Sequence, residues 1–185
     1  MQVPLSKELE QLTDEFCAMV KPIVQRMNKS GWLRFHDPKR LNVMLLMEAC
    51  NDFKSKSQEH GLPQDEISQV MSDFNALLSL IPALKELQTH GTWSFHKALL
   101  NYAQNPQMNR TKQWLFKQNS WRRLMQRLTK MEESGRHLVH PKLLKLSGKD
   151  LTDGDVMCLF HHGCVLWSFR SIERPFYAQD QRRDI

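Results

Sequence analysis

The chain has 185 residues, with 26 Lys and Arg against 20 Asp and Glu, which gives a formal net charge of +6. Its 41% hydrophobic and 25% charged residues are ordinary globular composition, which excludes wholesale disorder. None of its uncharged stretches reaches the roughly 18 apolar residues of a membrane span, and the N-terminus lacks the apolar core of a secretory signal. Four scattered cysteines do not suggest a disulfide framework. We therefore expect a cytoplasmic protein without a membrane partner.

Apolar residues recur at three- and four-residue steps in the first third of the chain, which is the period of an α-helix. The stripe over residues 5–27 predicts a first helix, kinked or divided by Pro22. Asp37 followed by Pro38 is typical of an N-cap and a first helical position, and predicts a second helix that ends near Ser57.

The same period continues through the rest of the chain. It predicts a third helix over residues 67–81 that ends before Pro82, and a short fourth helix around residues 95–102. A basic helix is expected over residues 110–134, where Gly135 stops it, and a final helix over residues 156–176.

The predicted fold class is therefore all-α, with about six to eight helices in a single compact protein or in two small lobes. The boundary that we infer separates an N-terminal helical part, residues 1–82, from a C-terminal helical part, residues 83–185, which contains the basic helix. No run of alternating polarity is long enough to indicate a strand.

The net charge is concentrated in one segment. Acidic residues are absent from Leu87 to Met131, and the rest of the chain is close to neutral, with 18 basic and 20 acidic residues. A single basic segment favours a polyanionic partner. The basic side chains of this window are Lys97, Arg110, Lys112, Lys117, Arg122, Arg123, Arg127 and Lys130.

Within the predicted basic helix, the cations gather on one face. At about 100° per residue, Arg123 and Lys130 lie within roughly 20° of Lys112, and Arg127 lies about 60° away. The apolar side chains fall on the opposite side, so we expect a line of outward cations about 27 Å long. Arg123 and Arg127 form a like-charged i,i+4 pair without an acidic neighbour in the sequence, which favours polyanion binding over an ordinary solvated face.

The chain offers little for catalysis or metal binding. His137, His140, Cys158 and His161 are weak candidates for a zinc site, but Cys158 also lies in an apolar helical pattern, where cysteine acts as a small hydrophobe. Gly148 precedes Lys149 without the upstream glycine of a phosphate-binding loop. We therefore predict no cofactor and no enzymatic activity.

The order of features in the second half of the chain resembles a known family. Thr-Trp-Ser-Phe-His-Lys-Ala-Leu-Leu at 92–100 is followed by basic segments at 109–116 and 121–128. A Leu-rich turn at 138–144 and a Trp-containing stretch with arginines at 166–177 complete the order. This half resembles the small subunit (the CasB family) of the type I-E CRISPR Cascade surveillance complex.

The resemblance implies a non-catalytic, nucleic-acid-binding subunit of an antiviral complex. Such a subunit would bridge other Cascade subunits, together with a second copy of itself. It would hold the displaced DNA strand and the backbone of the RNA–DNA hybrid, and so stabilise the R-loop. The predicted nucleic-acid-binding residues are Arg110, Lys112, Lys117, Arg122, Arg123, Arg127 and Lys130, with Arg170 and Arg174 added by the resemblance. The alternatives are a helical adaptor for an acidic protein and a small zinc-binding regulatory protein.

Overall fold

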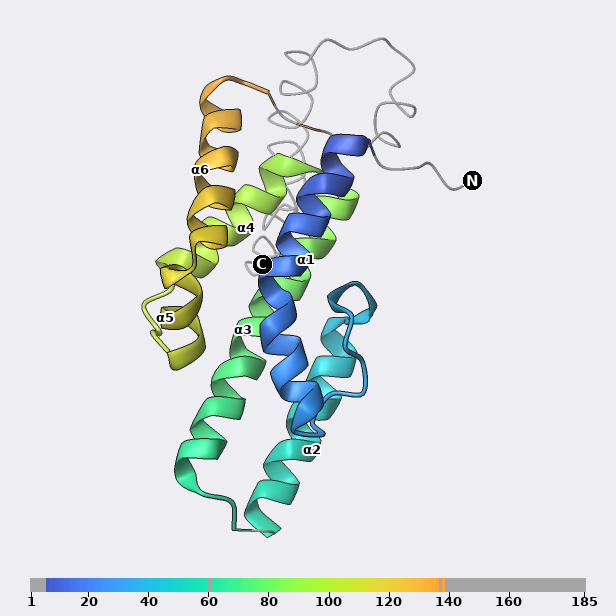
Figure 1. Cartoon of the computed structure of the whole chain (residues 1–185), viewed down its shortest axis with the longest axis vertical. Helices are drawn as coiled ribbons and strands as arrows, with labels where there is room; N and C mark the ends of the chain where they lie inside the picture. Colours follow the sequence, from blue (N-terminus) through green and yellow to red (C-terminus); the bar gives the residue numbers. More distant parts are fainter. Residues whose placement is uncertain (1–5, 60, 137, 139–185) are drawn as a thin grey trace, which may run out of the picture. The chain divides into compact units, whose positions relative to one another are not determined.

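The computed structural model describes residues 6–59, 61–136 and 138, and the regular structure in these ranges is entirely helical (Figure 1). The predicted all-α class is confirmed, and the described residues form six α-helices, while the final helix predicted over residues 156–176 lies outside them. All described residues belong to one compact unit. In chain order the elements are α1 (Lys7–Lys29), the short 3-10 helix η1 (Pro38–Arg40), α2 (Val43–Glu59), α3 (Gln64–Thr89), α4 (Thr92–Gln104), α5 (Arg110–Lys117) and α6 (Asn119–Glu133).

Helix α3 is the centre of the packing, because it contacts α1, α2, α4 and α5. Its length and composition would suffice for a membrane span, but 56% of its most apolar window is buried inside the protein, as in a core helix. Phe74 of α3 is fully buried together with one phenylalanine from each of α1, α2 and α4, namely Phe16, Phe53 and Phe95. The rings of Phe16 and Phe95 meet edge to face at 5.2 Å, an arrangement that aromatic pairs prefer.

Proline does not end or divide either helix that contains it. Helix α1 is continuous through Pro22, and α3 continues through Pro82 to Thr89, so the prediction that the third helix ends before Pro82 is wrong. Proline removes one backbone hydrogen bond, but the turn after Pro82 buries Ala83, Leu84 and Leu87, and this burial offsets the loss. The inferred boundary between residues 82 and 83 therefore falls inside one helix.

The helix predicted after Asp37 is shorter than expected. Asp37 accepts a hydrogen bond from the Lys39 amide and Pro38 occupies the first turn, but the element that they start is the one-turn η1. Helix α2 begins later, where the Asn42 side chain accepts a hydrogen bond from the Leu45 amide at 2.9 Å.

The predicted basic helix over residues 110–134 is two helices, which is a further correction. Gln118 separates α5 from α6 and has an extended backbone, with φ −72° and ψ 135°. In one continuous helix, Phe116 and Trp121 would point about 140° apart. The break brings their rings to 5.1 Å and places both about 6 Å from the ring of Tyr102 on α4. Aromatic packing therefore outweighs the loss of helical continuity.

The start of α5 is fixed by Asn109. Its Oδ1 accepts a hydrogen bond from the Lys112 amide at 2.8 Å and another from the Ser72 hydroxyl of α3 at 2.8 Å. Asn109→Ala is expected to lower the free energy of unfolding by about 1–2 kcal/mol, because both the helix cap and the link to α3 are lost. Urea denaturation followed by circular dichroism measures this. Asn51→Ala, at an exposed position inside α2, is the control, and an equal loss in both variants would contradict the capping role.

Candidate nucleic-acid interface

Helix α6 separates its apolar and basic side chains onto two sides. Trp121, Leu124 and Leu128 are buried in the core. Arg123, Arg127 and Lys130, spaced at i, i+4 and i+7, line a cleft of about 500 Å³ beside the N-terminal part of α1. The remaining side chains that line this cleft are Glu8, Gln126, Met131, Ser134, Arg136 and Leu138. We call this hollow, with its four cations, the α6 cleft.

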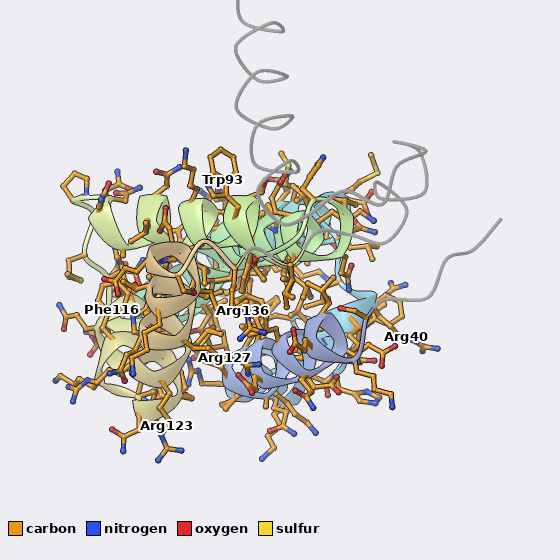
Figure 2. The ribbon with its side chains drawn as sticks, turned by 90° about the horizontal axis from the view of Figure 1, so that it is seen from above. Arg40, Trp93, Phe116, Arg123, Arg127 and Arg136 are labelled. Atoms are coloured by element: carbon orange, nitrogen blue, oxygen red, sulfur yellow. The ribbon has the colours of Figure 1, made fainter. Side chains whose placement is uncertain are left out.

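Arg136 reaches the α6 cleft through the way in which α6 ends. Gly135 has φ +67°, a left-handed conformation that glycine adopts without strain. The turn is closed by hydrogen bonds from the Gly135 amide to the Glu132 carbonyl and from the Arg136 amide to the Met131 carbonyl. Figure 2 shows Arg136 and Arg127 between the ribbons of α6 and α1, with Arg123 on the outer side. The turn therefore adds a fourth cation to the three of α6.

The cleft contains more positive than negative charge, but it is not free of acids. Arg127 Nη1 lies 2.7 Å from Glu15 Oε1 of α1, and the two side chains are 37% and 50% exposed. The expectation that Arg127 lacks an acidic neighbour is therefore wrong in three dimensions. Among the described residues, no carboxylate forms an ion pair with Arg123, Lys130 or Arg136.

The acidic end of α6 does not neutralise the cleft. Glu132 follows the basic row directly, yet its Oε2 lies 2.8 Å from Nδ1 of His96, a buried residue of α4. The Glu132 carboxylate therefore contacts α4 at the interface between α4 and α6. Neither Glu132 nor Glu133 lines the cleft.

Lys112 is not a surface cation, which corrects its predicted role. It is 1% exposed, and its Nζ donates a hydrogen bond to the Asn105 carbonyl at 2.6 Å. The ammonium group also lies 5.1 Å from the ring centre of Tyr102 and 5.5 Å from that of Phe116. Burial lowers the pKa of Lys112 below its ordinary value. Because the break at Gln118 changes the register of the two helices, the expected 27 Å line of cations does not form.

The other predicted binding residues are distributed differently. Arg110 Nη2 pairs with Asp65 Oδ1 at 2.8 Å in an exposed ion pair, and Lys117 and Arg122 are exposed but do not line the cleft. Of the predicted set, only Arg123, Arg127 and Lys130 are brought together there. Arg170 and Arg174 lie outside the described residues, as do the weak metal candidates His137, His140, Cys158 and His161. The described part of the chain contains no group of three or more side chains suited to a metal.

Two parts of the cleft were missed from the sequence. Arg136 lies just beyond the acid-free window, although Gly135 after a basic helix is a known signal for a helix end that turns back. Glu8, which lines the cleft, and Glu15, which pairs with Arg127, lie more than 100 residues before α6, and no local pattern connects them with that helix.

The comparisons with known proteins point to DNA helicases. No family model matches the chain. The ATP-dependent DNA helicase fml1 of Schizosaccharomyces pombe is 24% identical over 143 residues, which cover 76% of this chain and 17% of that protein. The ATP-dependent DNA helicase mph1 of Neurospora crassa is also 24% identical over 143 residues, covering 75% of this chain and 12% of that protein. The chain thus spans less than a fifth of the length of these curated relatives.

A solved structure shares the fold. The crystal structure of the Pyrococcus furiosus Hef helicase domain matches 79% of this chain and 30% of that chain, with a TM-score of 0.64 and 17% sequence identity. The helical arrangement described above therefore corresponds to one part of a larger chain.

These findings overturn the function predicted from the CasB resemblance. The prediction of a Cascade small subunit in antiviral defence is wrong, because the matched proteins are DNA helicases. Other Cascade subunits and a second copy of the chain lose their support as partners for the same reason. The prediction of no enzymatic activity is also contradicted, since both relatives are named as ATP-dependent DNA helicases. Nucleic acid is the part of the partner prediction that these relatives support.

Proposed function

We propose that this chain is a helical DNA-binding module related to a part of ATP-dependent DNA helicases, and that its α6 cleft holds phosphates of the DNA backbone. The observation that carries the proposal is the convergence of Arg123, Arg127, Lys130 and Arg136 on one cleft. The helicase relatives supply the class of polyanion, which is DNA.

The spacing of the cations suits a sugar–phosphate backbone. Arg123 and Lys130 are seven residues apart on α6, which corresponds to about 10 Å along the helix axis. That distance matches about three nucleotides at 3.4 Å per strand. Arginine donates two parallel hydrogen bonds to a phosphate, and such contacts fix position without reading the base sequence. We therefore expect binding that depends on salt and depends little on sequence.

The salt dependence of binding tests the proposal. Arg123, Lys130 and Arg136 form no ion pair within the described part of the chain. Three such cations should release counterions from DNA, so that the logarithm of the association constant falls against the logarithm of salt concentration with a slope of about −2.7. Between about 50 and 200 mM salt, affinity should then fall by about 40-fold. Fluorescence anisotropy of labelled duplex DNA of two unrelated sequences measures both quantities.

Competition with polyglutamate, which mimics an acidic protein, distinguishes DNA binding from the alternative function of an adaptor for an acidic protein. DNA should bind more tightly than polyglutamate of equal charge, because phosphates accept paired hydrogen bonds in a regular spacing. A slope near zero, or a preference for polyglutamate, would overturn the proposed function.

A further inference from the structure

One cation that lines the α6 cleft, Arg127, is already paired with a carboxylate. Glu8 and Glu15 are two turns apart on α1, so they lie on the same side of that helix. Glu8 lines the cleft, and Glu15 binds Arg127 at 2.7 Å. We propose that Glu15 is a phosphate mimic that DNA must displace from Arg127, and that it thereby sets the affinity of the cleft. This inference rests on the DNA binding proposed above.

The strength of the pair fits a displaceable contact. Both side chains are more than a third exposed, and exposed ion pairs contribute about 0.2–1 kcal/mol. A guanidinium has five N–H donors, and the Arg127–Glu15 pair is formed through Nη1. A phosphate that accepts two of these hydrogen bonds would therefore replace the carboxylate with a contact of better geometry.

The pair is not needed to hold α1 against α6. The two helices are in contact, and they share one apolar core to which α1 contributes Leu12 and Phe16, and α6 contributes Leu124 and Leu128. Burial of such side chains contributes about 1.5–3 kcal/mol each, which exceeds the contribution of the exposed ion pair. Loss of the carboxylate should therefore change binding more than folding.

Glu15→Gln is the direct test, and Asp14→Asn is its matched control. Asp14 is the preceding residue of α1 and also forms an exposed ion pair, but with Lys39 of η1 at 2.7 Å. Both substitutions remove one negative charge from the same helix. Glu15→Gln should tighten binding of duplex DNA about 1.4- to fivefold, which is the 0.2–1 kcal/mol of the lost competitor converted at RT of about 0.6 kcal/mol. It should also steepen the salt slope by about 0.9, because in the wild type the Glu15 carboxylate that is freed takes up a cation, and this uptake offsets the counterion released at Arg127.

A double-mutant cycle assigns the gain to Arg127. In an Arg127→Gln background, Glu15→Gln should give no increase in affinity or in salt slope, because its partner is already gone. Glu15→Ala should also tighten DNA binding, and it removes the carboxylate without adding an amide that could disturb the site. Urea denaturation verifies that each variant is folded. Asp14→Asn should leave both the affinity and the slope nearly unchanged.

The failure of this inference and that of the proposed function give different results. If the wild-type chain binds DNA with a steep salt slope but Glu15→Gln and Glu15→Ala bind no more tightly than Asp14→Asn, the displacement by phosphate is refuted while DNA binding stands. If Glu15→Gln tightens DNA binding equally in the Arg127→Gln background, the displacement of Glu15 by phosphate is refuted as well. Absence of salt-dependent binding in the wild-type chain would instead overturn the proposed function.

Discussion

Replacing Asp73 with alanine is expected to lower the free energy of unfolding by about 2–4 kcal/mol. Asp73 is a 1% exposed residue of α3 that accepts hydrogen bonds from Arg26 of α1 at 2.6 and 2.8 Å. It also accepts one from the Gln69 amide at 3.2 Å and one from the Thr111 hydroxyl of α5. The carboxylate thus links three helices at one point. Alanine would leave these hydrogen-bond donors without an acceptor in the interior. Each donor left unsatisfied lowers the free energy of unfolding by about 1–3 kcal/mol.

The exposure of Arg26 limits this effect. Its side chain is 40% exposed, so water replaces part of the lost interaction, and the effect stays below that of a fully buried charge left alone. Urea denaturation followed by circular dichroism measures the change.

Asp65→Ala provides a matched control on the same helix. Asp65 also pairs with an arginine, Arg110, at 2.8 Å, but its side chain is 89% exposed. Exposed pairs contribute little, so this substitution should lower the free energy of unfolding by less than about 1 kcal/mol. Equal losses for Asp73→Ala and Asp65→Ala would show that burial does not decide the strength of these pairs, contrary to the argument above.

The fold class could be predicted because local patterns determine it. Apolar residues at helical spacing mark the buried face of every helix, and the predicted fourth helix lies within α4. Helix ends were less predictable, because they depend on packing between helices. No proline or glycine marks the break at Gln118 in the sequence. The cause of the break is Tyr102, which lies on another helix and packs against Phe116 and Trp121.

The candidate site could be predicted only in part for a related reason. Charges along a sequence show which helix is basic, and three of the cations selected in this way, Arg123, Arg127 and Lys130, line the α6 cleft. They do not show which cations find partners from distant segments. Lys112 binds a loop carbonyl and lies near two aromatic rings, and Arg127 meets Glu15, 112 positions away.

The wrong function came from features that many helical proteins share. A helix that packs against a core and faces a polyanion needs tryptophan or leucine on one side and arginine or lysine on the other. The segment at 121–128 satisfies that requirement, so its order of residue types is a consequence of amphipathic packing. Such an order indicates an amphipathic helix with a basic outer face, and it does not identify a family.

Reversing two charges of the α6 cleft, Arg123→Glu together with Lys130→Glu, is expected to weaken DNA binding by on the order of 100-fold near 0.1 M salt. Each lost phosphate contact removes about 0.9 from the salt slope, and two such losses alone correspond to about 60-fold at this salt concentration relative to 1 M. The new carboxylates add repulsion of the phosphates. Anisotropy titrations should show the slope becoming shallower by about 1.8.

The control for this experiment is Lys54→Glu together with Lys56→Glu on α2, which changes the net charge by the same amount. Both lysines are exposed, and neither lines the α6 cleft. Because salt screens interactions beyond about 10 Å at 0.1 M, a charge change outside the cleft should weaken binding far less than one within it. Equal weakening by the two double variants would mean that the overall charge of the protein, and not the cleft between α1 and α6, governs its affinity for DNA.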